Sequence, residues 1–156
     1  MGFRGPGIYE ILPLQAPTLS ANSWGGGMEP GAVVKTYPRG DSSKDPDTNA
    51  LWQLALVSGT GESAEYLIIN IRTGYFITAT ADKTITSTPQ ISPKDPSCHW
   101  TIKSTPTDGY DVYTINNKIH SRGQLNVRYG STSPGADILS WPIENGDNSK
   151  WYFDPR

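Results

Sequence analysis

Aromatic and carboxamide side chains recur at matching places in the chain, and their chemistry suits one kind of ligand. Tyr37 ends an alternating stretch, and Asn49 lies three residues before Trp52. Trp141 and Asn148 repeat this arrangement near the C-terminus. A flat aromatic ring can cover the apolar C–H face of a sugar ring, whereas a carboxamide both donates to and accepts from hydroxyl groups. The two pairs are therefore candidates for binding a pyranose.

Residues that could catalyse a reaction do not form a convincing set. Cys98 and His99 are adjacent, so on an extended strand their side chains point to opposite faces and do not form a nucleophile–base pair. His99 and His120 lie too far apart in the sequence to suggest a metal site. The glycine run 25–27 lacks the spacing of a phosphate-binding loop. We therefore expect no enzymatic activity, no metal and no cofactor.

The elements that must position the aromatic and carboxamide residues are short strands. Alternating stretches rich in β-branched and aromatic residues predict three units of four strands. Each fourth strand begins with a tryptophan, at Trp52, Trp100 and Trp151, spaced by about fifty residues, and we place these three side chains in the core. The predicted strands are 7–11, 18–21, 32–37 and 52–56, then 64–70, 75–79, 83–88 and 100–102, then 110–116, 124–127, 136–141 and 151–153.

Twelve strands are too many for one open twisted sheet, and closure into a barrel removes the unpaired edges. The prediction is an all-β protein, a β-trefoil of twelve short strands in three pseudo-repeats. We expect a single domain over residues 1–156, with repeats of about 7–58, 59–105 and 106–156.

The composition narrows the class of protein and its partners. The 156 residues include 16 glycines and 13 prolines, which leaves little room for long helices. The net charge of −2 comes without a Lys/Arg cluster, so we expect neither nucleic acid nor an anionic membrane surface as a partner. The single cysteine, Cys98, cannot form an intrachain disulfide, and the N-terminus lacks the apolar run of a signal peptide. We therefore expect a cytoplasmic protein that is not inserted in a membrane.

The repeat pattern resembles the ricin B-chain lectin family, whose units end in a Gln-x-Trp motif. Here Ala50, Cys98 and Ser149 stand where that family has glutamine, so only the tryptophan is kept. More narrowly, the stretches GIYEI, GAVVKTY, SAEYLIIN, STPQISPKDPS, YTINNK and KWYFD resemble the Sclerotinia-type agglutinins of ascomycete fungi, over essentially the whole chain. The resemblance implies a cytosolic homodimeric lectin that binds glycans ending in galactose or N-acetylgalactosamine.

The resemblance also implies roles for residues of the first unit. Tyr37 stands where family members place the stacking aromatic residue, and Asn49 matches their sugar-binding asparagine. Ser20 replaces an aspartate that is frequent in the family, and the guanidinium fork of Arg39 is a plausible substitute for it. Packing roles for the aromatic residues stay open at this point. The predicted first site comprises Tyr37, Asn49, Arg39, Ser20, Asn22 and Trp24.

The other two units differ in how much of this pattern they keep. The second unit has Thr88 and Ser97 at the aromatic and asparagine positions, so we expect no site there. In the third unit Asn126 is aligned with Ser20. The alternative role for Trp141, the aromatic residue of this unit, is a packing or dimer contact. The predicted second site comprises Trp141, Asn148 and Asn126.

Two other functions remain open from the sequence. β-Trefoils also serve as protease inhibitors that present one exposed loop to an enzyme, and the loops 42–48 and 105–108 could do this. An inhibitor needs a rigid loop rather than an aromatic residue beside a carboxamide, so the Tyr37–Asn49 pair favours the lectin. The third possibility is a trefoil that binds another protein and no glycan.

Overall fold

The computed structural model describes residues 2–40, 47–89, 92 and 94–156. Within these residues, short β-strands are joined by turns and by 3₁₀ helices of three residues each. No helix in the described part of the chain is long and apolar enough to cross a membrane. The strands are β1 (Gly7–Pro13), β2 (Leu19–Ser23), β3 (Ala32–Pro38), β4 (Trp52–Ser58), β5 (Glu65–Asn70), β6 (Phe76–Ala79), β7 (Ile85–Thr88), β8 (Trp100–Ser104), β9 (Tyr113–Asn117), β10 (Gln124–Val127), β11 (Ile138–Trp141) and β12 (Trp151–Pro155).

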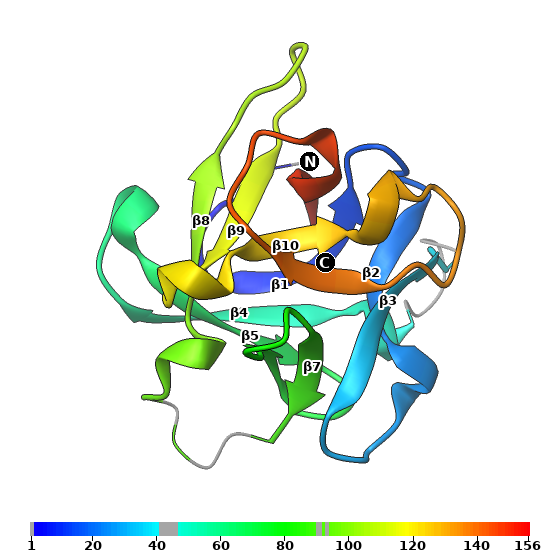
Figure 1. The fold of residues 1–156 in the computed structure, drawn as a ribbon, viewed down its shortest axis with the longest axis vertical. Coiled ribbons are helices and arrows are strands. Elements are labelled where there is room, and N and C mark those ends of the chain that lie inside the picture. The colour runs from blue at the N-terminus through cyan, green and yellow to red at the C-terminus, as the bar shows by residue number, and fades with distance from the viewer. Residues whose placement is uncertain (1, 41–46, 90–91, 93) are drawn as a thin grey trace.

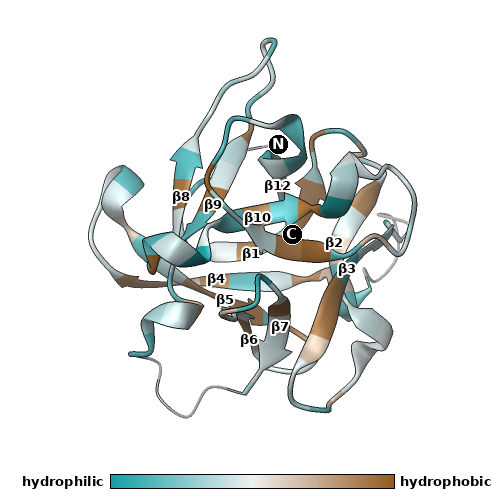
Figure 2. Cartoon of the chain, in the orientation of Figure 1, coloured by the Kyte–Doolittle hydropathy of each residue, from teal (hydrophilic) through white to brown (hydrophobic). Residues whose placement is uncertain are grey.

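All twelve strands predicted from the sequence are found within the described residues. Their residues alternate in hydropathy along the strands, while the connecting loops are mostly hydrophilic or neutral (Figure 2). The largest shift of a predicted strand start is at β9, which begins at Tyr113 rather than at Tyr110. Thr107 pairs with Tyr110 across a turn in which Asp108 and Gly109 adopt positive φ angles of 50° and 81°, and this turn ends the extended conformation.

Six strands form a closed barrel. β1, β4, β5, β8, β9 and β12 pair in a complete circuit, each antiparallel to both of its neighbours. Closure leaves none of these six strands with an unpaired edge. At three pairings around the circuit a tyrosine lies opposite a tryptophan: Tyr9 and Trp52, Tyr66 and Trp100, Tyr113 and Trp151.

The other six strands form three hairpins that pack together beside the barrel (Figure 1). The hairpins are β2–β3, β6–β7 and β10–β11. β3 also pairs with β7, and single bridges join Lys35 to Asp137 and Thr84 to Leu139. The three hairpins are thus tied to one another through their backbones, and the predicted β-trefoil is confirmed.

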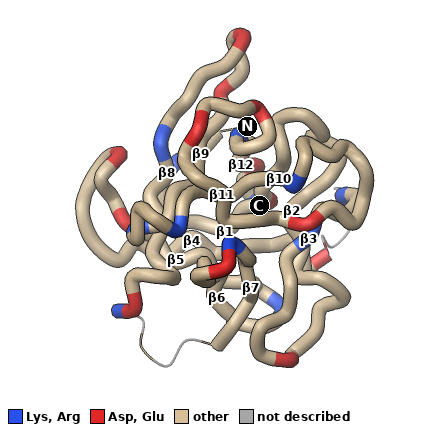
Figure 3. The backbone as a smooth tube through the Cα atoms, viewed as in Figure 1, with Lys and Arg blue, Asp and Glu red and all other residues tan. Residues whose placement is uncertain are grey.

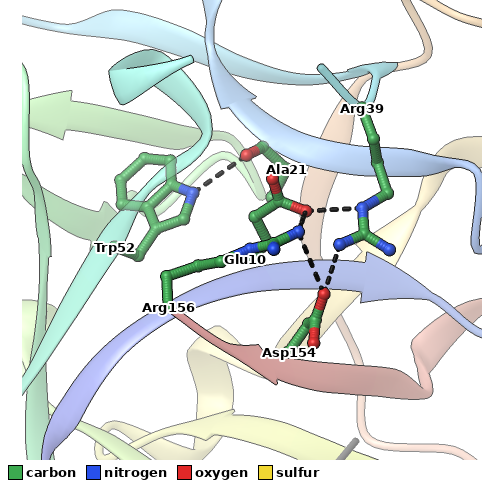
Figure 4. Close-up of polar contacts among 6 residues, drawn as sticks. All are labelled: Glu10, Ala21, Arg39, Trp52, Asp154 and Arg156. Carbon is green, nitrogen blue, oxygen red and sulfur yellow. Dashed lines mark hydrogen bonds and ion pairs between the residues drawn. The ribbon is translucent and has the colours of Figure 1, made fainter. Parts of the chain in front are cut away.

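The three tryptophans predicted to be buried lie in the core, each with no exposed surface. Each indole N–H donates to a backbone carbonyl of the second strand in its own repeat, which satisfies the one polar atom of the side chain. Figure 4 shows the first of these bonds. The donor–acceptor distances are 2.9 Å for Trp52 to Ala21, 3.0 Å for Trp100 to Ile77 and 3.2 Å for Trp151 to Leu125.

The N-terminal segment adds a second aromatic group to the core. The ring of Phe3 lies 5.0–6.0 Å, centroid to centroid, from the rings of Tyr9, Tyr66, Tyr113 and Phe153. Burial raises the pKa of the Tyr66 and Tyr113 hydroxyls. Because side chains fill the barrel, ligands must bind outside it, on the hairpins and turns.

Candidate functional site

A pocket of about 400 Å³ lies on the first hairpin, between the end of β2 and the short 3₁₀ helix η2 (Thr48–Ala50). The structure brings together four residues of the predicted first site here, from segments well separated in sequence. The pocket is lined by Asn22, Trp24, Gly25, Tyr37, Asp47 and Asn49.

Two aromatic rings form the apolar side of this pocket. Trp24 and Tyr37 meet edge to face, with ring centroids 5.9 Å apart and an interplanar angle of 77°. Their exposed fractions are 38% and 46%, so both rings keep surface available to a ligand. The Nζ atom of Lys35 lies 5.1 Å from the centroid of the Trp24 ring, within the range of a cation–π interaction.

Asp47 and Asn49 form the polar side of the pocket. Asp47 caps η2, because its Oδ1 accepts a hydrogen bond from the backbone N–H of Asn49 at 3.0 Å. Its Oδ2 accepts from the Asn22 amide at 3.3 Å. Asp47 was not among the predicted site residues. The signal was an aspartate two residues before the asparagine, which is the spacing of a cap.

The Asn49 carboxamide lies close to Gly26. The Asn49 Oδ1 atom is buried and has no hydrogen-bond partner among the described residues, and a Cβ at position 26 would lie 2.5 Å from it. Gly26 also has a φ of 59°, so glycine is required here on both counts. Asn49 and Asp47 both line the pocket, and because the Asn49 oxygen is buried, its amide nitrogen is the side-chain polar atom left to act as a donor, whereas the Asp47 carboxylate can only accept.

Two predicted residues of the first site lie elsewhere. Arg39 donates from Nε to Glu10 and from Nη2 to Asp154, and Arg156 joins the same group of charges (Figure 4). Glu10 is only 2% exposed, so this ion pair draws the guanidinium away from the pocket. Ser20 has no exposed surface, and its Oγ is enclosed. The structure therefore places both residues outside the first pocket, contrary to the sequence expectation.

The strand register corrects one alignment made from the sequence. Near the end of the third strand of a repeat, Tyr37 lies opposite Ser20 in the first repeat and Trp141 lies opposite Gln124 in the third. Asn126 follows Gln124 by two residues, so its equivalent is Asn22 and not Ser20. With this correction the pockets of the first and third repeats correspond more closely, because Asn22 lines the first pocket and Asn126 lines the second.

A second pocket, of about 340 Å³, contains all three residues of the predicted second site. The Asn126 Nδ2 donates to Ser149 Oγ at 2.8 Å, and the Asn148 Nδ2 donates to Asn126 Oδ1 at 3.4 Å. Trp141 is 37% exposed. Its backbone passes so close to Gly123 that a Cβ there would lie 1.9 Å from the Trp141 carbonyl oxygen.

The second pocket differs from the first in its charge. Gly146 stands where the first repeat has Asp47, so the capping carboxylate is missing. Lys83 and Arg128 line the pocket instead, together with Asp82. Elsewhere, acidic and basic residues are scattered over the loops and strand ends, as Figure 3 shows.

Of the two loops considered for an inhibitor, most of the loop 42–48 lies outside the described part of the chain, which leaves out residues 41–46. The loop 105–108 belongs to the β8–β9 hairpin, which projects from the body of the molecule (Figure 1). The aromatic and amide groups are gathered on the hairpin side instead. A threefold barrel with such pockets on its hairpins has the features of a β-trefoil carbohydrate-binding protein.

Similarity to known proteins supports the assignment to the β-trefoil carbohydrate-binding proteins. The family described as ricin-type beta-trefoil lectin domain-like matches residues 48–141. An agglutinin of Sclerotinia sclerotiorum is 59% identical over 156 residues, which cover 100% of both chains. The chain therefore belongs to the ricin-type β-trefoil lectins, and it is a carbohydrate-binding lectin and not an enzyme. Membership of this family also favours the lectin over the protease inhibitor.

Solved structures of low sequence identity share the fold. The Rhizoctonia solani agglutinin has a TM-score of 0.77 at 16% identity, over 99% of this chain and 98% of that chain. The C-half of an earthworm R-type lectin, solved in complex with GalNAc, has a TM-score of 0.67 at 18% identity, over 97% of this chain and 100% of that one.

Proposed function

We propose that the first pocket binds the terminal galactose or N-acetylgalactosamine of glycans. The observation that carries the proposal is the pairing of exposed aromatic rings with one acceptor and one donor group, supplied by Asp47 and Asn49. The axial 4-hydroxyl of galactose leaves an apolar C–H face that can stack on Tyr37. Its neighbouring 3- and 4-hydroxyls then match a carboxylate beside an amide. The GalNAc complex of the earthworm lectin supports the same sugar class.

We further propose that the chain acts as a homodimer, because a single shallow pocket binds weakly. A monosaccharide of about a dozen heavy atoms, at about −0.3 kcal/mol per atom, binds with a Kd near 1 mM. Linked sites raise the apparent affinity by about 10²- to 10⁴-fold. Sedimentation velocity should therefore show a dimer at the concentrations at which the protein agglutinates cells, and a monomer there would contradict this part of the proposal.

Titration of the Tyr37→Ala variant with GalNAc tests the first pocket. Loss of the stacking ring should weaken binding about tenfold or more, with the thermal midpoint lowered by only a few degrees. Tyr110→Ala is the matched control, since Tyr110 is 56% exposed and lies on the projecting β8–β9 hairpin, away from the pocket. Equal affinity of the Tyr37→Ala variant and the wild type would remove the first pocket from the proposal.

A further inference from the structure

The second pocket lies between two repeats, and backbone bonds fix its walls. One wall is the β6–β7 turn of the second repeat, which contributes Asp82, Lys83 and Thr84. The other wall is the β10–β11 hairpin of the third repeat. The backbone N–H of Ser140 donates to the Lys83 carbonyl at 3.0 Å, and Thr84 bridges to Leu139. The turn therefore holds Lys83 in a fixed place relative to the third repeat.

The basic groups of this pocket have atoms left for a ligand, and one oxygen of its carboxylate is engaged within its own turn. Asp82 Oδ1 accepts from the hydroxyls of Thr80 and Thr84 and from the Thr84 backbone N–H. None of the ion pairs among the described residues includes Lys83, and its Nζ lies 4.7 Å from the centroid of the Trp141 ring. Arg128 uses only its Nε, at 3.3 Å, to pair with Asp137.

Two residues at the mouth of the pocket adopt an uncommon backbone conformation. Lys83 has a φ of 69° and Tyr129 a φ of 56°, and Asp108 is the only other non-glycine residue of the described chain with a positive φ. This conformation is disfavoured for side chains with a Cβ, and such residues concentrate at ligand sites. Tyr129 is also 93% exposed, and the centroid of its ring lies 5.9 Å from Cζ of Arg128, which lines the same pocket.

The two pockets differ in their charged residues. The lining of the first contains the Asp47 carboxylate and no lysine or arginine, although Lys35 lies over its Trp24 ring, whereas the lining of the second contains Lys83 and Arg128 beside one carboxylate, that of Asp82. Two pockets that share an aromatic residue and an asparagine therefore differ in the charge that they present. A neutral sugar gains little from Lys83, but a sugar with an anionic substituent gains a charge-assisted hydrogen bond.

We propose that the second pocket selects acidic sugars, in which a pyranose carries a carboxylate or a sulfate group. Lys83, with Arg128, binds the anionic group, and the exposed rings of Trp141 and Tyr129 contact the sugar. This inference rests on the proposed lectin function but assigns the second pocket a ligand class distinct from that of the first. Lys83 then determines specificity for the third repeat, although it belongs to the second.

The test uses three matched sugars: galactose, galacturonic acid and galactose 6-sulfate. They share one ring and differ only in the group at carbon 6, which is a neutral hydroxymethyl, a carboxylate or a sulfate ester. The indole N–H signal of Trp141 in ¹⁵N NMR spectra reports the second pocket, and that of Trp24 reports the first. We expect both acidic sugars to shift the Trp141 signal with a Kd about three- to tenfold lower than that of galactose. The comparison of the two acids shows whether carboxylate or sulfate is preferred.

Lys83→Gln should abolish the difference in Kd between galactose and the two acidic sugars. In the wild type, raising the salt concentration from 50 to about 300 mM should reduce this difference. Lys103→Gln is the control, because Lys103 is an exposed lysine on β8 that lines neither pocket. Equal Kd values for galactose and both acids at Trp141, or an unchanged preference in Lys83→Gln, would overturn the proposal. Galactose binding reported by Trp24 would then still stand, so failure here is distinguishable from failure of the proposed first site.

Discussion

One aspartate position shows how a structural residue can also serve a binding pocket. Asp47 and Asp95 each precede the fourth strand of a repeat by five residues, and each caps a 3₁₀ helix through a bond to the backbone N–H two residues on. In the second repeat, the bond from the Ser97 backbone N–H to the Asp95 carboxylate is the main reason why the pKa of Asp95 is lowered. Only Asp47 stands beside exposed aromatic rings. The same cap therefore lines a pocket with exposed aromatic rings in the first repeat but not in the second.

This pair provides a matched test at the residue scale. Asp47→Ala and Asp95→Ala should each cost about 1 kcal/mol of unfolding free energy, the typical value of a lost helix cap. Only Asp47→Ala should also weaken GalNAc binding, by about tenfold, because it removes the acceptor for the sugar hydroxyls. Urea denaturation and calorimetric titration of both variants provide the comparison. Similar binding losses in the two variants would show that Asp47 acts through stability alone.

At the scale of elements, a cluster of four charges joins strands that are distant in sequence. Arg39 follows β3, Glu10 lies in β1, and Asp154 and Arg156 lie in β12 or directly after it. The cluster therefore fastens the first hairpin to the strand pair β1–β12 that closes the barrel. Because Glu10 is almost fully buried, its charge depends on these guanidinium groups for compensation.

Arg39→Ala should therefore lower stability and leave sugar binding unchanged. We expect a loss of about 2 kcal/mol, since Glu10 keeps only its pair with Arg156, at 3.3 Å. Arg39→Lys should recover part of the lost stability, because lysine keeps the positive charge. The recovery should be incomplete, because lysine cannot contact Glu10 and Asp154 through two separate nitrogen atoms as the guanidinium group does. Urea midpoints together with GalNAc titrations measure both quantities. A variant of normal stability with weakened GalNAc binding would return Arg39 to the binding site.

At the scale of the whole molecule, a charged contact connects the second and third repeats. Glu65 at the start of β5 accepts from Lys118 Nζ at 2.9 Å and lies 3.0 Å from His99 Nδ1. The hydrogen bond from Lys118 is the main cause that holds the pKa of Glu65 below its ordinary value of 4.5, and His99 adds to it. Because the pKa of Glu65 is lower in the folded state, its ionised carboxylate stabilises the fold at pH values above the ordinary pKa. This stabilisation is lost as the pH falls through the lowered pKa of the folded state.

Glu65→Gln should accordingly be less stable than the wild type at pH 7, by about 1–2 kcal/mol. The difference should narrow between pH 5 and about pH 3, where the wild-type carboxylate becomes protonated. Urea midpoints of both proteins at a series of pH values measure this trend. A difference that stays constant over the whole range would mean that the carboxylate charge is not the source of the stability.

The repeat architecture follows from local patterns that the sequence contains in full. Alternating hydropathy defines each strand, and three tryptophans at regular spacing place one large buried side chain in each repeat. Tyr37 and Trp141 could also be aligned from the sequence, since both end the third strand of a repeat and strand ends are set by local residues. Barrel closure then follows from the number of strands.

The composition of the two pockets was decided by tertiary structure, because each pocket joins segments that meet only after the barrel closes. Asp47 meets Asn22 across the first repeat, and Lys83 enters the pocket of the third repeat from the second. Arg39, which the sequence suggested as a ligand of the sugar, is instead held by a buried carboxylate. Hydropathy patterns do not contain these contacts, since a charged side chain takes whichever partner the fold brings within reach. The sequence by itself determined the repeats and their aromatic positions, and the packing of the hairpins determined which charges surround them.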